Sequence, residues 1–131
     1  MDHDLQFRII SPVDVLFETA TTLVTMPGEE GEFGVMPMHA PLIASLKPGI
    51  VKISVEGGDE KYFIWGGIAR VTGLEADVIT EFAINLASTN KDVILEKIST
   101  LKDSINHESE IDKQEQLTEE LLKLESLFSY L

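Results

Sequence analysis

The chain has 131 residues, of which 44% are hydrophobic and 25% charged, and it contains no cysteine. These values are ordinary for a single globular domain with its own apolar core, and they exclude a disulfide framework and thiolate chemistry. The formal net charge of −13 disfavours nucleic acid and anionic lipid as partners, because both are negatively charged. The acidity serves either solubility alone or the attraction of a neutral or basic protein.

The N-terminal part of the sequence is typical of short strands separated by turns. Apolar and polar residues nearly alternate over residues 5–10, which is the period of a half-buried strand, and Pro12 ends this run. A β-branched run over residues 21–26 ends at Pro27 and Gly28. Each of these runs is of ordinary length for a strand.

Five further runs continue this pattern, each bounded by glycine, proline or a polar turn, at residues 43–46, 51–55, 62–65, 68–72 and 77–82. Gly57, Gly58 and Asp59 predict a hairpin turn between two of them. Such spacing is typical of a sandwich or a barrel. We therefore expect an antiparallel β-sandwich or barrel of about ten short strands over residues 1–87.

The hydrophobic period changes after residue 87. Two stretches carry apolar residues at spacings of 4, 3 and 4, which is the pattern of one helix face; they are Ile94, Ile98, Leu101 and Ile105, then Leu117, Leu121, Leu124 and Phe128. Thr89 and Asp92 fit a capping box at the start of the first helix, and residues 106–109 read as a polar loop. The sequence thus predicts an antiparallel two-helix hairpin over residues 88–131, and an α+β chain.

The predicted hairpin has two interpretations. Helices of this length are marginal in water by themselves, so each depends on packing against the other and against the sandwich. The hairpin is therefore either a fixed structural element or a part that detaches at modest cost in free energy.

No motif in the sequence indicates a catalytic or metal site. There is no phosphate-binding loop and no dinucleotide fingerprint. The three histidines, His3, His39 and His107, do not have metal-ligand spacing. The residues therefore predict no catalytic group, no bound cofactor and no metal.

An acidic cluster precedes the middle of the chain, at Glu29, Glu30 and Glu32. It lacks the regular spacing of oxygen donors that a calcium loop requires. It is either a solvated loop or a contact patch for another protein.

No apolar run approaches the ~20 residues that span a bilayer. Residues 1–8 include acidic side chains and have neither the apolar core of a signal peptide nor the arginine-rich composition of a transit peptide. We therefore expect the protein to work in the compartment where it is made.

Residues 27–49 read PGEEGEFGVMPMHAPLIASLKPG and are dense in glycine and proline. This density predicts a tightly specified backbone, because glycine supplies conformations that other residues avoid. His39 is predicted to be a structural histidine bonded to backbone. The expected structural positions are Gly28, Gly31, Gly34, Pro37, His39, Pro41 and Gly49, with Gly66 and Gly67 further along.

This segment resembles the epsilon subunit of bacterial-type rotary ATP synthases, the counterpart of the mitochondrial delta subunit. The family pattern G-x-x-G-x-x-G-V-x-P-x-H-A-P-L is matched by residues 28–42 and continues with Leu-Lys-Pro-Gly at residues 46–49. It resumes with Phe-Ile-Trp-Gly-Gly-Ile-Ala at residues 63–69. The resemblance covers the whole chain in order, with a sandwich followed by a hairpin.

The resemblance implies a non-catalytic subunit of the central stalk that couples proton-driven rotation to ATP synthesis on other subunits. The sandwich would bind the gamma subunit and rest on the membrane ring of c subunits, with Glu32 facing the ring and Glu29, Glu30 and Phe33 beside it. In relatives the hairpin lies folded or extends toward the catalytic alpha and beta subunits and blocks ATP hydrolysis. The implied location is the cytoplasmic face of the bacterial inner membrane, as a peripheral protein.

The sequence departs from the family in the hairpin. Many relatives open the first helix with Asp-x-x-Arg-Ala, and some bind ATP there, but this chain has no arginine after Arg70. We expect weak ATP binding or none, because bidentate phosphate recognition by arginine is missing. Residues 90–131 hold five lysines and ten acidic residues, a net charge of −5. Since relatives use basic residues at an acidic segment of a catalytic subunit, we expect weak inhibition.

Two alternatives belong to other functional classes. A free-standing β-sandwich binding module with a helical oligomerisation tail would form homo-oligomers, and a hydrolase using glutamate and histidine would have a deep polar pocket near His39. Only the coupling subunit explains the ordered match over residues 28–69.

Overall fold

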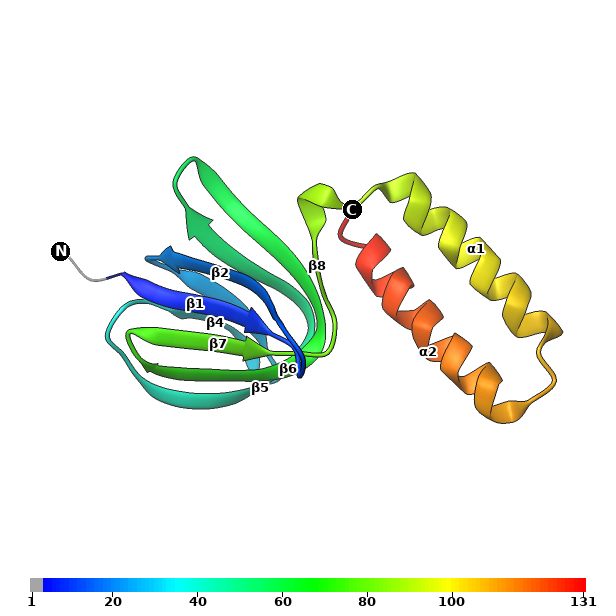
Figure 1. Cartoon of the computed structure of the whole chain (residues 1–131), viewed down its shortest axis with the longest axis horizontal. Coiled ribbons are helices and arrows are strands. Elements are labelled where there is room, and N and C mark those ends of the chain that lie inside the picture. The colour runs from blue at the N-terminus through cyan, green and yellow to red at the C-terminus, as the bar shows by residue number, and fades with distance from the viewer. Residues whose placement is uncertain (1–3) are drawn as a thin grey trace. The chain divides into compact units, whose positions relative to one another are not determined.

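The computed structural model describes residues 4–131, so His3 lies outside the described residues. The contacts divide the chain into a unit that ends at Ala87 and a second unit of Ser88–Leu131. The first is a β-sandwich and the second is a pair of antiparallel helices (Figure 1), which confirms the predicted fold class.

The sandwich contains eight strands in the described residues, fewer than the ten or so expected. They are β1 (Leu5–Ile10), β2 (Val15–Thr21), β3 (Val24–Gly28), β4 (Gly31–Val35), β5 (His39–Val55), β6 (Gly58–Gly73), β7 (Glu75–Ile79) and β8 (Ala83–Asn85). Their order is β2-β1-β7-β6-β5-β3-β4, with β8 pairing with β6. The expected antiparallel arrangement holds for every ladder in these residues except β1–β7, which is parallel.

The strand count is lower because two predicted breaks lie inside long strands. The runs 43–46 and 51–55 are both part of β5, and the runs 62–65 and 68–72 are both part of β6. Gly66 and Gly67 have φ values of 80° and 149°, so they bend β6 without ending it. β6 pairs with β8 at residues 62–64 and with β7 at residues 68–72, so the glycines stand where the strand changes neighbour.

The chain between residues 15 and 26 also differs from the expectation. The β-branched run 21–26 is divided, because Thr21 is the last residue of β2 and Val24 is the first of β3. β2 was not predicted, because apolar and polar residues do not alternate regularly along it. Its register against β1 shifts between Ile9 and Ile10, which indicates a bulge.

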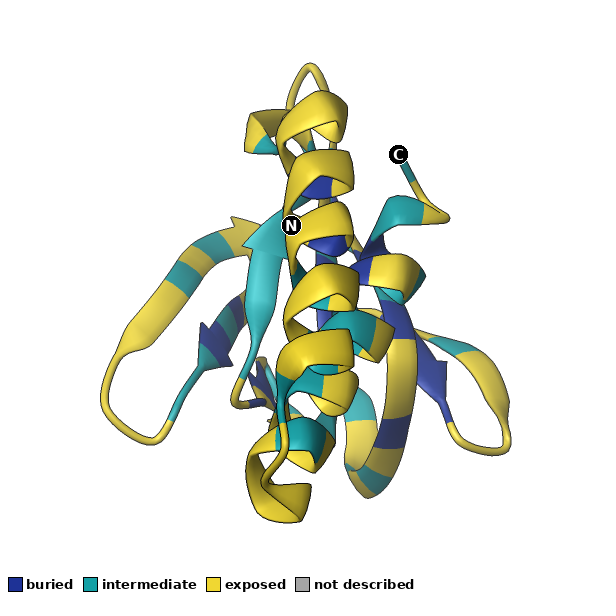
Figure 2. Cartoon of the chain, turned by 90° about the vertical axis from the view of Figure 1, so that its right-hand side faces the viewer, coloured by how far each residue is buried: buried dark blue, intermediate teal, exposed yellow. Residues whose placement is uncertain are grey.

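The core of the sandwich is made of residues that alternate along the strands. Leu5, Phe7 and Ile9 of β1 are fully buried, while the residues between them face outward. The buried cluster consists of Leu5, Phe7, Ile9, Val24, Met26, Val35, Leu46, Val51, Ile53, Ile64, Ala69, Val71, Ala76 and Val78. Figure 2 shows the resulting bands of buried and exposed residues on the strands.

A short 3-10 helix (Leu86–Ser88) leads to α1 (Lys91–His107) and α2 (Ile111–Phe128). The predicted capping box is one residue out of place, because Asn90 is the N-cap and its side chain accepts hydrogen bonds from the backbone N–H of Asp92 and Val93. Asparagine competes well with threonine at this position, since its side-chain oxygen reaches the same donors.

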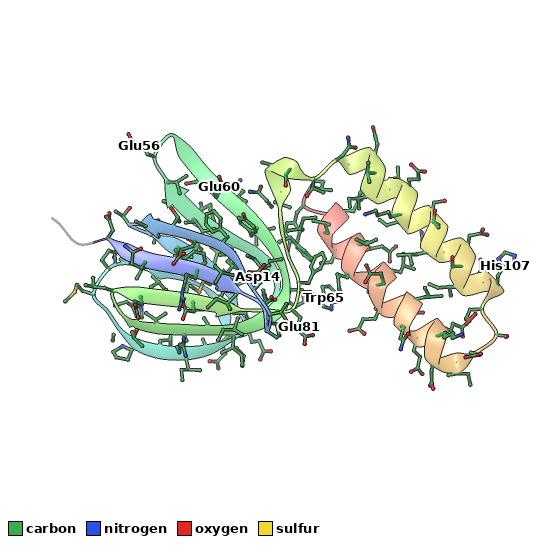
Figure 3. All side chains as sticks on the ribbon, viewed as in Figure 1. Asp14, Glu56, Glu60, Trp65, Glu81 and His107 are labelled. Carbon is green, nitrogen blue, oxygen red and sulfur yellow. The ribbon has the colours of Figure 1, made fainter. Side chains whose placement is uncertain are left out.

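The predicted loop 106–109 is also shorter than expected. α1 continues through His107, whose Nδ1 lies 2.8 Å from the carbonyl oxygen of Asp103 and whose ring projects from the helix end (Figure 3). Ile94, Ile98 and Leu124 from the predicted stripes are buried, whereas the remaining stripe residues are half-buried. Leu127 is buried too, although it is outside the predicted stripe. No helix in the described part of the chain is long and apolar enough to cross a membrane.

Candidate docking surface

The acidic cluster forms the turn between β3 and β4. Gly28 pairs with Gly31, so Glu29 and Glu30 are the two residues of a tight hairpin turn. Gly31 has a φ of 132°, a conformation that side chains rarely adopt. A Cβ on Gly28 would lie 2.6 Å from the carbonyl oxygen of Gly31 and 2.9 Å from the Phe33 ring. The glycines are therefore required by the backbone of the turn.

The turn is fixed to the strand beside it. The backbone N–H of Glu29 donates a 3.0 Å hydrogen bond to the carbonyl oxygen of Ser45 in β5. Phe33, half-buried, packs against the sandwich core. These two contacts hold the acidic turn against β5 and against the sandwich core.

An open pocket of about 700 Å³ lies between this turn and β5. It is lined by Gly28, Glu29, Glu30, Gly31, Glu32, Phe33, His39, Leu42, Ile43, Ala44 and Ser45. The structure thus gathers all four predicted contact residues around one hollow of the surface. We name the exposed glutamates of this pocket, Glu29, Glu30 and Glu32, the acidic rim.

The carboxylates of the acidic rim are exposed, and within residues 4–131 none of them forms an ion pair. Three unpaired carboxylates on a rigid turn make a surface that attracts a basic or hydrogen-bond-donating partner. A rigid backbone lowers the entropy lost when such a partner binds.

His39 also lines this pocket, and it is half-buried. Its Nδ1 lies 2.7 Å from the carbonyl oxygen of Ala40, the next residue. Ile43, which is 75% exposed and also lines the pocket, was not among the predicted contact residues. The sequence around it, Leu-Ile-Ala-Ser-Leu, has no regular alternation of apolar and polar residues that would have marked Ile43 as exposed.

The other predicted structural positions have different physical roles. A Cβ on Gly49 would lie 2.9 Å from Cβ of Pro27, and one on Gly34 would lie 3.3 Å from Cδ1 of Leu23. A Cβ on Gly67 would overlap the carbonyl oxygen of Ile79. Pro37 is half-buried and Pro41 is exposed.

A second charged cluster lies on the outer face of the sheet and was not predicted. Arg8 and Arg70, the two arginines of the chain, are the cross-strand partners of Asp77 on either side. Arg8 donates hydrogen bonds of 3.1 and 3.3 Å to the two carboxylate oxygens, and Arg70 donates one of 2.7 Å. Burial would raise the pKa of Asp77, but the hydrogen bonds from Arg8 and Arg70 outweigh it and lower the pKa.

This arginine–aspartate cluster explains why a carboxylate with only 5% of its side chain exposed is tolerated outside the core. The three side chains come from adjacent strands of the sheet. The cluster was not predicted, because Arg8 and Asp77 are 69 residues apart in the sequence. No group of three or more histidine, aspartate or glutamate side chains in residues 4–131 is arranged to hold a metal ion.

Residues 4–86, which are more than half of the chain, match the family described as ATP synthase, Delta/Epsilon chain, beta-sandwich domain. The chain belongs to the ATP synthase delta/epsilon chain family. The matched range ends within the 3-10 helix, so it contains all eight strands and the whole acidic rim.

Curated relatives agree with this family. An ATP synthase epsilon chain of Rickettsia bellii is 38% identical over 108 residues, which are 80% of this chain and 100% of the relative. An ATP synthase epsilon chain of Parvibaculum lavamentivorans is 32% identical over 128 residues, which are 97% of both chains. About a fifth of this chain thus has no counterpart in the shorter Rickettsia relative.

Solved structures share the fold. A chain in a structure of the Euglena gracilis mitochondrial ATP synthase, comprising OSCP, F1 and c-ring, superposes with a TM-score of 0.72 at 21% identity, covering 99% of this chain and 82% of that one. A chain in a structure of the Tetrahymena thermophila mitochondrial ATP synthase central stalk and c-ring gives a TM-score of 0.52 at 15% identity, covering 64% and 68%.

Proposed function

We propose that this protein is the epsilon-type subunit of the central stalk of a rotary ATP synthase. It does no chemistry itself, and it couples the proton-driven rotation of the membrane ring to ATP synthesis on other subunits. The observation that carries this proposal is the family match over the whole sandwich, supported by a relative aligned over 97% of both chains.

The sandwich is proposed to bind two partners, the gamma subunit of the stalk and the ring of c subunits. The protein would then belong to a membrane-associated complex, as a peripheral subunit on the cytoplasmic face of the bacterial inner membrane. The test is a pull-down of the tagged protein from native membranes. Recovery of gamma and the catalytic subunits supports the proposal, whereas an isolated homo-oligomer would support a free-standing binding module instead.

The acidic rim is the proposed contact with the polar loops of the ring, with Glu32 facing them. Its three carboxylates have no ionic partner in residues 4–131, which suits a surface that meets donors on another protein. A Glu32→Gln variant should bind isolated rings several-fold more weakly at low salt, because a charge at an interface acts mainly through long-range attraction.

A matched control for this test is Glu56→Gln. Glu56 lies at the β5–β6 turn, is exposed, and is not part of the pocket (Figure 3). It carries the same charge change and should leave ring binding unaltered. Equal losses from both variants would show that net charge matters and that the acidic rim is not the contact.

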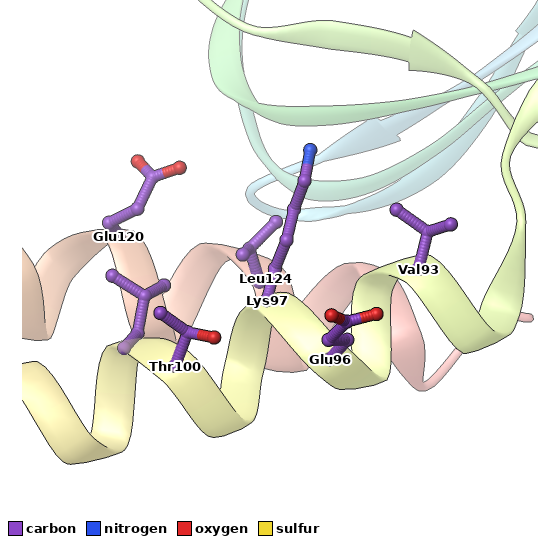
Figure 4. A pocket seen from close by; sticks show the side chains of 7 residues that line it. Val93, Glu96, Lys97, Thr100, Glu120 and Leu124 are labelled. Carbon is purple, nitrogen blue, oxygen red and sulfur yellow. The ribbon is translucent and has the colours of Figure 1, made fainter.

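The hairpin is proposed to bind ATP weakly or not at all. An apolar hollow of about 460 Å³ on the hairpin is lined by Val93, Glu96, Lys97, Thr100, Leu101, Glu120 and Leu124 (Figure 4). One lysine beside two glutamates is a poor setting for a triphosphate, and no arginine occurs in α1 or α2. Isothermal calorimetry with ATP should give no heat of specific binding. Micromolar affinity would refute this.

We also propose that the hairpin inhibits ATP hydrolysis only weakly. A hairpin with a net charge of −5 is repelled by an acidic segment on a catalytic subunit. Removing residues 90–131 from the assembled complex should change the hydrolysis rate little. A large activation on removal would contradict the proposal and show that contacts other than charge hold the inhibited state.

A further inference from the structure

The turn between β4 and β5 holds a methionine in a conformation that lowers stability. The backbone N–H of His39 donates a 3.2 Å hydrogen bond to the carbonyl oxygen of Met36, which closes a β-turn over residues 36–39. Pro37 and Met38 are the central residues, and Met38 has a φ of 69°, as the third residue of a type II turn requires. Glycine or asparagine is the usual residue there, because a larger side chain is strained.

No polar or aromatic contact of the Met38 side chain within residues 4–131 offsets this strain. The side chains of Met36 and Met38 are both exposed. In the same part of the chain, neither thioether forms a hydrogen bond or a ring contact. Backbone strain that packing does not explain is concentrated at binding and active sites. The turn offers a ligand two sulfur atoms, from residues that are two positions apart.

His39 adds a nitrogen donor to the same turn. Its Nδ1 lies 2.7 Å from the carbonyl oxygen of Ala40. A carbonyl oxygen only accepts hydrogen bonds, so Nδ1 carries the proton and Nε2 of the neutral ring keeps its lone pair. Metal-binding histidines have this arrangement, in which one ring nitrogen donates to a carbonyl or carboxylate and the other binds the metal.

The turn is fixed by the strand beside it. The backbone N–H of Met38 donates a 3.0 Å hydrogen bond to the carbonyl oxygen of Gly73 in β6, and Gly73 is also the cross-strand partner of His39. A β-turn keeps its first and fourth Cα atoms within about 7 Å, so Met36 and His39 stand close together on either side of the turn. A backbone that is already ordered loses little entropy when a ligand binds.

The donor atoms determine which metal suits the turn. Thioether sulfur and imidazole nitrogen are uncharged, soft or intermediate ligands that suit Cu(I), whereas Ca²⁺ and Mg²⁺ require oxygen. His39 also lines the pocket of the acidic rim, whose negative charge raises the local concentration of cations. The spacing of the histidines alone predicted no metal, because two of these three donors are methionines.

We propose that the sulfur atoms of Met36 and Met38 and Nε2 of His39 form a binding site for a soft monovalent cation, of which Cu(I) is the biological one. This site goes beyond the proposed coupling function and does not depend on it. Its test uses the full chain by itself, so its failure is distinguishable from failure of the pull-down with gamma.

Silver nitrate in chloride-free buffer is the first probe, because Ag⁺ is soft, monovalent and stable in air. Protein labelled with ¹³C at the methionine methyl groups is titrated and followed by NMR. The signals of Met36 and Met38, assigned by substitution, should shift together and saturate at one equivalent, while that of the fully buried Met26 stays in place. Cu(I) competed against bicinchoninate without oxygen should show the same stoichiometry.

Substitution of each donor should weaken silver binding. Loss of a group that only orients a ligand weakens metal binding about 10- to 100-fold, so Met36→Leu, Met38→Leu and His39→Gln should each cost at least about ten-fold. His107→Gln is the matched control. The Nδ1 of His107 also faces a carbonyl oxygen, that of Asp103 at 2.8 Å, but α1 and α2 contain no methionine. This variant should bind silver as wild type does.

Met38→Gly separates the loss of a ligand from the loss of structure. It removes one thioether and also relieves the strain of the turn, so the proposal predicts weaker silver binding by a protein that melts at a higher temperature. Silver binding by Met38→Gly with wild-type affinity, equal losses from His39→Gln and His107→Gln, or unshifted Met36 and Met38 signals at one equivalent would each overturn it.

Discussion

The sandwich and the hairpin are stabilised in different ways. The sandwich buries a cluster of fourteen residues contributed by six strands, and its contacts join residues far apart in the sequence. The hairpin has four buried residues, Ile94, Ile98, Leu124 and Leu127, and its polar contacts are mostly exposed. The protein therefore combines a cooperatively folded sandwich with a hairpin whose low stability makes it sensitive to small changes.

The largest expected effect is in the core of the sandwich. Phe7→Ala should destabilise the protein by about 4 kcal/mol, because it removes a fully buried aromatic ring from β1, which is paired with a strand on both sides. Trp65, the one tryptophan of the chain, lies in β6, so its fluorescence during urea unfolding follows the sandwich. A loss below about 1 kcal/mol would mean that the core re-forms around the cavity.

The next effect concerns the arginine–aspartate cluster. Asp77→Asn should cost about 1–2 kcal/mol at neutral pH, a value moderated by the partial exposure of both arginines. Because the pKa of Asp77 is lower when folded, its stabilisation is complete above the unfolded value of about 4 and is lost as the pH falls through the folded value. Urea midpoints from pH 7 down to pH 2 should therefore converge for Asp77→Asn and wild type, and a constant gap would argue against the ionic role.

A smaller effect should be confined to the hairpin. Asn90→Ala removes the side chain that caps α1 and should cost the hairpin about 1 kcal/mol, while the Trp65 transition of the sandwich stays in place. Hydrogen exchange of the amides of α1 measures this separately from the sandwich. If the amides of both units lose protection together, the two units unfold as one and the hairpin has no separate stability.

The smallest effect should be stabilising. Met38 is the one described non-glycine residue with positive φ, at 69°, and its side chain is 70% exposed. Met38→Gly should raise the free energy of unfolding by up to about 1 kcal/mol, since glycine adopts this conformation without strain and little packing is lost. Thermal melts with Met36→Gly as the control would show it, because Met36 is also exposed but has no positive φ.

Much of the architecture could be predicted from local patterns. The alternation of apolar and polar residues at 5–10 correctly predicted the first strand, and the two stretches with apolar residues at spacings of 4, 3 and 4 correctly predicted both helices. These patterns are informative because the direction of successive side chains follows from the backbone geometry of each element. The strand count was wrong where Gly66 and Gly67 lie, since glycine in the left-handed region serves equally in a turn and in a bend within a strand. A turn and a bend can be distinguished here only when the pairing of β6 with its neighbours β7 and β8 is known.

In the candidate site, the charged residues Glu29, Glu30 and Glu32 and the tight turn that glycines impose on them could be read from the local sequence. Strand pairing was needed to show that this turn faces His39 and Ile43 across a pocket, and that Arg8, Asp77 and Arg70 meet on one sheet face. The physical reason is that strand register brings together residues that are distant in the chain, and no local pattern records which strands will be neighbours.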